Sequence, residues 1–176
     1  IGMLELVKDA ETYGAIMAAD ERKLSVIGKD TVTVWMKKQC ERKESKVTFD
    51  QAVENFVHSC AGYCVTTYLL GIGDRHSDNV MIRRDGVFFH IDFGHFLGNF
   101  KSKFGIRRER TPFKFTIHFA DLMGYEGKND KPFREFIDLC KSALVALRRQ
   151  GSLFIYLFRL MLATGIPELK SEEDIE

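Results

Sequence analysis

The longest periodic segment of the chain begins at Thr48 and ends at Leu70. Thr48 and Gln51 form a capping box, in which the threonine oxygen accepts a backbone N–H bond and the glutamine bonds back. Apolar residues then recur at spacings of three and four until glycines follow at positions 71 and 73. This pattern predicts a long helix with one buried face and a glycine-rich end.

A β-hairpin is expected directly after this helix. Residues 79–83 and 87–91 are rich in apolar residues, and the Asp85-Gly86 pair between them is typical of a tight hairpin turn. Further helices are expected over 10–19, 29–42, 116–123, 130–150 and 152–164, and residues 3–7 are interpreted as a short buried strand or connector. The predicted fold class is therefore α+β, mostly helical, with a small β-hairpin at one edge.

The 176 residues are 45% hydrophobic and 29% charged, which is enough for one well-buried core and too mixed for disorder. No apolar run approaches the roughly 18 residues that a membrane-spanning helix needs, so a soluble domain is expected. The chain starts at Ile1, and a capping box at 171–174 stands where the sequence stops. We interpret the chain as a piece of a longer protein, truncated at both ends.

Four cysteines lie on segments that we expect to be helical: Cys40, Cys60, Cys64 and Cys140. They form no CxxC pair, and reduced thiols in a cytosolic protein fit them best. Cys60 and Cys64 share a helix face and could in principle bind zinc, but no second pair of ligands stands at a suitable distance. Core packing is the favoured interpretation, because free cysteine is among the most buried residue types.

Polar side chains gather at both ends of the expected hairpin. Residues 73–79 combine an acid, a cation, an imidazole and an amide between the helix end and the first strand, and Asp92 follows the second strand. Asn79 and Asp92 could bind Mg²⁺ from two sides, since this hard ion prefers oxygen ligands. Protein kinases pair a catalytic-loop Asn with the Asp of a DFG sequence in this way. Any one of these residues alone could be structural, but together they favour a phosphoryl-transfer site.

A basic stretch follows the hairpin inside a nearly neutral chain. The formal net charge is +1, yet residues 101–114 carry six lysines and arginines against the single acid Glu109. Residues 92–114 show little periodicity and are expected to form a long loop. Alone, such a run is most often a solvated surface loop. Next to a DFG sequence it indicates a particular anionic ligand.

The order Asp-Arg-His in this chain reverses the His-Arg-Asp of protein kinases. The sequences G-D-R-H-x-x-N at 73–79 and H-I-D-F-G-H at 90–95, together with S-C-A-G-Y-C at 59–64, resemble the phosphoinositide 3-kinase family. The segments 101–105 and 107–110 are similar to the two basic boxes of its class I members. The resemblance implies that residues 1–176 are the C-terminal lobe of a two-lobed kinase domain. It implies a hinge near 4–7, a catalytic loop at 73–79, an activation loop at 92–114 and helices over 116–164.

The resemblance also implies a role for each of twelve residues. The catalytic candidates are His76, Asp74 and His95; the metal ligands are Asn79 and Asp92; the ATP-binding residues are Glu5, Val7, Met81, Ile91 and Asp92; and the residues that bind substrate phosphates are Lys101, Lys103 and Arg108. His76 would take the inositol hydroxyl proton or hold the γ-phosphate, with His95 as a second candidate. Which histidine is the general base stays open at this point.

The implied activity is transfer of the ATP γ-phosphate to the 3-hydroxyl of phosphatidylinositol 4,5-bisphosphate, with Mg²⁺ or alternatively Mn²⁺. The implied partners are the lipid at a membrane surface, an upstream N-terminal lobe, and a regulatory or adaptor subunit that contacts regions outside this chain, with no nucleic acid. The expected location is the cytoplasm, with peripheral recruitment to the plasma membrane. Without a glycine-rich phosphate loop and an ATP lysine, the chain alone is expected to be inactive. Two alternatives remain, a Ser/Thr protein kinase of related fold and a non-catalytic lipid-binding module.

Overall fold

The computed structural model describes residues 3–20, 28–97, 113–166, 169–172 and 175, and the backbone alone of residues 102–103 and 106–107. In chain order the described elements are β1 (Ala10–Thr12), α1 (Tyr13–Ala18), α2 (Thr31–Cys40), α3 (Phe49–Leu69), β2 (Val80–Arg83), β3 (Phe88–His90), β4 (Ser102–Lys103), β5 (Ile106–Arg107), α4 (Ile117–Leu122), α5 (Lys131–Arg149), α6 (Gly151–Met161) and the 3₁₀ turn η1 (Leu162–Thr164). The mostly helical α+β class predicted from the sequence is confirmed.

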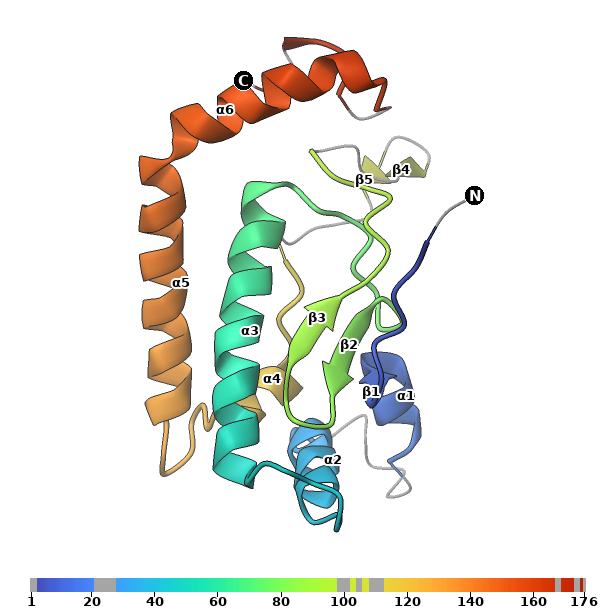
Figure 1. Cartoon of the computed structure of the whole chain (residues 1–176). Helices are drawn as coiled ribbons and strands as arrows, with labels where there is room; N and C mark the ends of the chain where they lie inside the picture. Colours follow the sequence, from blue (N-terminus) through green and yellow to red (C-terminus); the bar gives the residue numbers. More distant parts are fainter. Residues whose placement is uncertain are drawn as a thin grey trace.

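The long helix α3 lies at the centre of the molecule. Its capping box is present, with Thr48 N–H donating to Gln51 Oε1 at 2.9 Å and Gln51 N–H donating to Thr48 Oγ1 at 3.3 Å. One side of α3 packs against β3 and another against α5 (Figure 1). The helix therefore connects the small sheet to the C-terminal helices, and its position fixes where the chain re-enters the sheet after residue 69.

The sheet has three antiparallel strands in the order β1-β2-β3, one more than the sequence predicted. Residues 10–12 were expected to begin a helix; they pair with β2 instead, with Glu11 opposite Ile82. Thr12 then accepts the Ala15 N–H at 3.0 Å and caps α1. A three-residue strand is too short to show a period, so its backbone pairing with β2 rather than its pattern decides the conformation.

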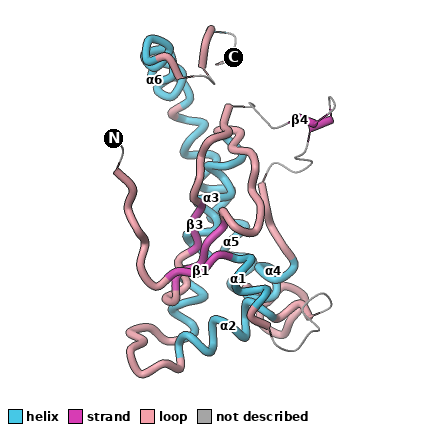
Figure 2. The backbone as a smooth tube through the Cα atoms, turned by 90° about the vertical axis from the view of Figure 1, so that its right-hand side faces the viewer, coloured by secondary structure: helices cyan, strands magenta, loops and turns pink. Residues whose placement is uncertain are grey.

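Of the two alternatives for residues 3–7, a short buried strand or a connector, the structure contradicts the buried strand. These residues form an extended segment without strand pairing, and Met3, Leu4 and Leu6 are almost fully exposed. Figure 2 shows this N-terminal segment running away from the sheet on its own. Apolar composition alone predicted burial, but no described element packs over the segment.

The hairpin turn predicted at Asp85-Gly86 is confirmed, and it packs on α3. Gly86 has a φ of +95°, and a Cβ there would lie 2.0 Å from the carbonyl oxygen of Ala52. Asn55 Nδ2 donates to the Asp85 carbonyl at 2.8 Å, and the Arg83 guanidinium holds the Asp85 carboxylate. Only glycine combines the positive φ with this close backbone approach, so the turn ties β2 and β3 to the first turns of α3.

Aromatic rings make up much of the core beneath the sheet. Phe88 of β3 meets the rings of Phe56 and Phe119 edge-on, at centroid distances of 5.6 and 5.5 Å. Cys60 and Cys64 are buried in the same core with their Sγ atoms 3.9 Å apart. Burial raises the pKa of the Cys60 thiol well above its ordinary value, which disfavours the thiolate that zinc requires. Core packing is thus the structural role of this pair.

The C-terminal helices follow the predicted pattern with small shifts at their ends. Helices α4, α5 and α6 lie within the ranges expected over 116–123, 130–150 and 152–164, except that α6 begins one residue earlier. The helix start expected at 171–174 falls partly outside the described residues. Among the helices in the described ranges, none is both long and apolar enough to cross a membrane.

Stability should depend on pH through His90, which ends β3 and is 4% exposed. Burial, with a smaller effect of the nearby Arg75 charge, lowers the pKa of His90 from 6.5 to about 4. Between these two values the unfolded chain binds a proton that the folded chain does not. The free energy of unfolding should therefore fall by about 3 kcal/mol for this group as the pH drops from 7.5 to 4.

Urea unfolding of the chain at a series of pH values measures this dependence. The His90→Gln variant should show a shallower decline between pH 6.5 and 4, because it lacks the titrating imidazole. If the free energy of unfolding fell equally with pH in the two proteins, His90 would not be the source of the pH dependence.

Candidate functional site

The ends of three elements meet at one edge of the sheet. Helix α3 ends, β2 begins and β3 ends on the same side of the molecule, as Figure 1 shows. The register pairs Val80 with His90, and the Ile91 N–H donates to the Asn79 carbonyl at 3.0 Å. Asp92 therefore directly follows the residue whose backbone pairs with that of Asn79.

The loop at 73–79 is held by the side chain of its last residue. Asn79 is 2% exposed, its Oδ1 accepts the His76 N–H at 3.0 Å, and its Nδ2 donates to the Asp74 carbonyl at 2.5 Å. From outside the loop, Gly14 N–H of α1 donates to the Ser77 carbonyl at 2.8 Å. The conformation of the loop is therefore fixed both from within and by the N-terminal part of the chain.

The segment after β3 turns back onto this loop. Gly73 N–H donates to the His95 carbonyl at 2.9 Å, and Leu97 N–H donates to the Leu70 carbonyl at 2.7 Å. Asp74 and Asp92 have φ values of 57° and 58°, in the left-handed region. Such conformations in residues other than glycine cluster at functional sites, which supports the site predicted here.

Asn79 and Asp92 have the chemistry that a magnesium site needs. Asp92 is exposed, so its carboxylate is accessible, and Asn79 Oδ1 has a second lone pair beyond the His76 bond. Among the described residues, no group of three or more His, Cys, Asp or Glu side chains could hold a metal. One carboxylate and one amide fit Mg²⁺, which usually completes its shell with water and substrate phosphate oxygens.

The two candidate histidines differ in their surroundings. The side chain of His76 is 52% exposed, and its Nδ1 accepts the Asp78 N–H at 3.2 Å. This bond orients the ring and leaves Nε2 as the nitrogen that can meet a substrate. His95 is half-buried, and its carbonyl is the acceptor for Gly73. The site therefore presents one oriented imidazole and holds the second histidine through its backbone.

Arg75 has a structural role that sequence reasoning missed. Its guanidinium is half-buried and donates to backbone carbonyls on both sides of the site, including that of Asp92. Burial lowers the pKa of this group, while the charges of Asp92 and Asp74 oppose the shift. No residue pattern in the sequence signals this role, because the acceptors are backbone carbonyls, which every residue carries.

The residues predicted to contact ATP lie at different places in the structure. Met81 and Ile91 share the face of the hairpin that points away from α3, since residues 80 and 82 are buried toward the core and 81 and 91 are not. Glu5 is exposed and Val7 half-buried on the extended N-terminal segment. The structure thus brings Met81 and Ile91 to the site edge, while no hydrogen bond within the described chain holds Glu5 or Val7 there.

The predicted phosphate-binding residues fall mainly outside the described part of the chain. Lys101 and Arg108 lie outside it, and only the backbone of Lys103, in β4, is described. Lys114 closes the same basic stretch, and its Nζ lies 5.5 Å from the centroid of the Tyr13 ring. Burial lowers the pKa of Lys114. This last cation therefore anchors the end of the loop on α1.

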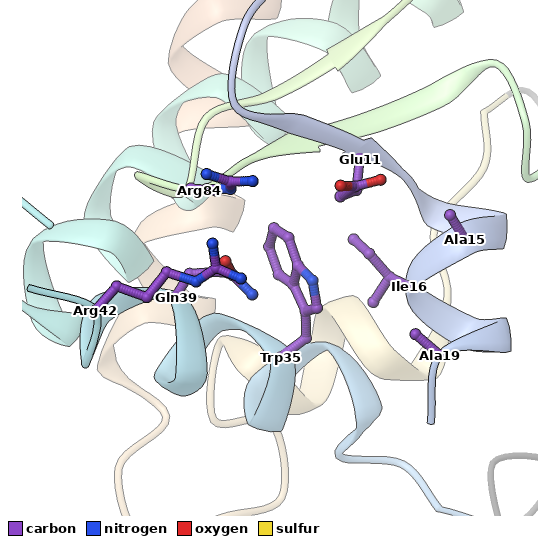
Figure 3. A pocket seen from close by; sticks show the side chains of 8 residues that line it. All are labelled: Glu11, Ala15, Ile16, Ala19, Trp35, Gln39, Arg42 and Arg84. Carbon is purple, nitrogen blue, oxygen red and sulfur yellow. The ribbon is translucent and has the colours of Figure 1, made fainter. Parts of the chain in front are cut away.

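A cavity of ≈ 250 Å³ lies apart from these residues, between α1 and α2. Figure 3 shows the indole of Trp35 inside it, with Arg42 and Arg84 on one side and Glu11 above. None of the twelve predicted site residues lines this cavity. The candidate site is therefore the edge of the sheet, not the cavity.

Comparison with known proteins points in one direction. The model of the family "Phosphatidylinositol 3- and 4-kinase" matches residues 3–171. Phosphatidylinositol 3-kinase 2 of Dictyostelium discoideum is 49% identical over 100% of this chain, and phosphatidylinositol 3-kinases 1 and 3 of the same organism are 46% and 45% identical over 99%. The chain spans only 11% of the length of phosphatidylinositol 3-kinase 1, 9% of kinase 2 and 10% of kinase 3.

Proposed function

Because the chain belongs to the phosphatidylinositol 3- and 4-kinase family, we propose that the protein carrying it is a lipid kinase. The reaction is transfer of the ATP γ-phosphate to the 3-hydroxyl of phosphatidylinositol 4,5-bisphosphate, as in class I members. The observation that carries the proposal is the set of backbone hydrogen bonds joining residues 73–79 to residues 91–95. These bonds bring the DRH and DFG sequences together at one edge of the sheet.

Each proposed role uses a group that this edge presents. Asn79 Oδ1 and the Asp92 carboxylate would hold Mg²⁺, which would neutralise charge on the transferred phosphoryl group. Because His76 Nδ1 accepts the Asp78 N–H, the neutral ring carries its proton on Nε2, which can donate a hydrogen bond to the γ-phosphate. Taking the inositol hydroxyl proton would require the ring to release the Nδ1 bond, and His95 is the second candidate for contact with the γ-phosphate. Support for His76 comes from the 3.2 Å bond at Nδ1, which orients the ring. Asp74 orients the loop, since its carbonyl accepts the Asn79 carboxamide.

ATP and lipid are bound by the remaining predicted residues. Backbone groups of Glu5 and Val7 bind the adenine edge, above a floor formed by Met81 and Ile91. The lipid phosphates are bound by Lys101, Lys103 and Arg108, and the arginine can offer a bidentate fork.

Other parts of a longer protein complete the proposed enzyme. A glycine-rich phosphate loop and an ATP lysine come from a lobe outside this chain, so the 176 residues alone are inactive. A regulatory or adaptor subunit binds elsewhere on the longer protein. The enzyme works in the cytoplasm and reaches the plasma membrane peripherally. The short share of each relative that this chain spans supports a larger assembly.

The proposal is tested with the full-length protein, Mg-ATP and vesicles that contain phosphatidylinositol 4,5-bisphosphate. We expect a 3-phosphorylated product, and we expect His76→Ala to lower its rate of formation by about 10²-fold or more, since a positioned hydrogen-bond donor to the transferred phosphoryl group contributes on that scale. Headgroup analysis of the product gives the measurement. Normal turnover in His76→Ala would remove this residue from the mechanism.

Charge reversal in the basic stretch separates a lipid acceptor from a protein acceptor. In the triple variant Lys101→Glu, Lys103→Glu and Arg108→Glu, lipid phosphorylation should fall by at least about tenfold, because each lost phosphate contact costs roughly a kcal/mol or more. Autophosphorylation or peptide phosphorylation, if the wild type has either, should change much less. A variant with normal lipid turnover would contradict the assignment of these cations. Activity on peptides alone would favour a protein kinase.

A further inference from the structure

The guanidinium of Arg75 binds three backbone carbonyls at once. Nε donates to Gly73 at 2.9 Å, Nη1 donates to Ile91 at 2.7 Å, and Nη2 donates to Asp92. The first acceptor belongs to the DRH loop and the other two belong to the segment after β3. All three nitrogens of the guanidinium are therefore used to join these two parts of the site.

The two acceptors on the second segment lie on either side of one residue. The Ile91 carbonyl belongs to the peptide plane before Asp92, and the Asp92 carbonyl belongs to the plane after it. Holding both planes fixes φ and ψ of Asp92, whose φ is 58°. A left-handed conformation in a residue other than glycine costs on the order of 1–3 kcal/mol and persists only where its surroundings impose it. Arg75 supplies two of the bonds that impose it.

The ring of Phe93 adds a third contact on the same segment. The Arg75 Cζ lies 5.6 Å from its centroid, within the range of a cation–π interaction. The guanidinium thus contacts three consecutive residues, 91, 92 and 93. A lysine could not reproduce this arrangement, since its ammonium is a compact point charge without a planar fork.

We propose that Arg75 is a positioning residue, which fixes the two peptide planes around Asp92 and so aims the carboxylate at the ion shared with Asn79. The inference rests on the proposed function, since it assigns Arg75 a part in that same metal site. Residues that orient a metal ligand typically change metal affinity or activity by 10–100-fold when they are replaced. The effect of Arg75 should therefore appear in the metal dependence.

Two measurements on the full-length protein test the proposal. The first is hydrogen exchange without nucleotide or metal, in which the amides of Gly73 and Leu97 report on the bonds that close the site. The second is the Mg²⁺ concentration that gives half-maximal lipid phosphorylation. Arg75→Lys should speed exchange at both amides and raise the Mg²⁺ midpoint by about tenfold or more. The control is Arg84→Lys, which alters a guanidinium of the hairpin that pairs with Asp9. It should change neither the exchange at the two amides nor the Mg²⁺ midpoint.

Each outcome either supports or overturns the role proposed for Arg75. Wild-type exchange at Gly73 and Leu97 in Arg75→Lys would overturn the proposal, as would an activity loss with an unchanged Mg²⁺ midpoint. If exchange becomes faster throughout α3, the Arg75→Lys variant unfolds. The same exchange measurement is then made on Phe93→Leu. In Phe93→Leu, faster exchange confined to the Gly73 and Leu97 amides supports the proposal, and unchanged exchange at these amides overturns it. A wild-type protein that phosphorylates no lipid would sink the proposed function, while the metal-free exchange still decides the role of Arg75.

Discussion

Replacing Asp92 with asparagine is expected to lower kcat for lipid phosphorylation by about 10³-fold, which corresponds to roughly 4 kcal/mol of transition-state stabilisation. The amide keeps the size of the side chain and tolerates the left-handed backbone at this position. It removes the negative charge that would bind Mg²⁺ opposite Asn79. Initial rates of the full-length protein at saturating ATP and Mg²⁺ measure the effect.

The matched control for this change is Asp138→Asn. Asp138 lies exposed on α5, where its carboxylate pairs with Lys141 at 3.2 Å. Surface pairs of this kind contribute little, so activity should stay near that of the wild type. If Asp92→Asn kept more than about a tenth of the wild-type rate, a loss too small for a metal ligand, Asp92 would not bind the catalytic ion.

The Phe88→Ala substitution is expected to lower the free energy of unfolding by about 3–5 kcal/mol. Phe88 is 0% exposed and packs edge-on against Phe56, Phe119 and Tyr63. Its removal leaves a cavity between α3 and the sheet that surrounding side chains cannot fill without moving. Urea unfolding of the chain at neutral pH measures the change.

Tyr68→Ala provides the comparison, on the helix against which β3 packs. Tyr68 is 54% exposed near the end of α3, and its truncation should change the free energy of unfolding by no more than about 1 kcal/mol. Similar losses for the two variants would mean that the ring cluster around Phe88 does not dominate the stability of the fold.

The regular parts of the fold were predictable because each has a local signal. The capping box at Thr48 and Gln51 fixes the start of α3, and the three-and-four spacing of apolar residues fixes its buried face. The Asp85-Gly86 turn predicts the hairpin, since few other residue pairs adopt its backbone conformation. These signals depend on neighbours in the sequence, so they can be identified without knowledge of tertiary contacts.

Strand β1 depends on distant contacts and was missed, and of the two alternatives for residues 3–7 only the connector agrees with the structure. Residues 10–12 are extended because β2, about seventy positions away, offers them a ladder of hydrogen bonds. Residues 3–7 are largely apolar, yet Met3, Leu4 and Leu6 remain exposed. Neither fact can be derived from composition or period, because both depend on what lies nearby in space.

The sequence proposed the members of the candidate site, and the structure adds the geometry that motifs do not contain. Motif spacing and family resemblance brought together Asp74, His76, Asn79, Asp92 and His95. They did not show that the Asn79 carboxamide is buried and bonded to Asp74 and His76. They also did not predict the role of Arg75. Its hydrogen-bond partners are backbone carbonyls, which every residue has, so the residue types in the sequence do not identify them.

The direct continuation of β1 into α1 sets a lower limit on any shortened version of this domain. A deletion up to residue 14 would strip the partner from β2 and leave the Met81–Arg83 amides and carbonyls as an open edge, a template for unwanted pairing between molecules. It would also remove the Gly14 bond that steadies Ser77. Protein engineers who trim this domain should therefore keep its first strand, even though that strand contains only three residues.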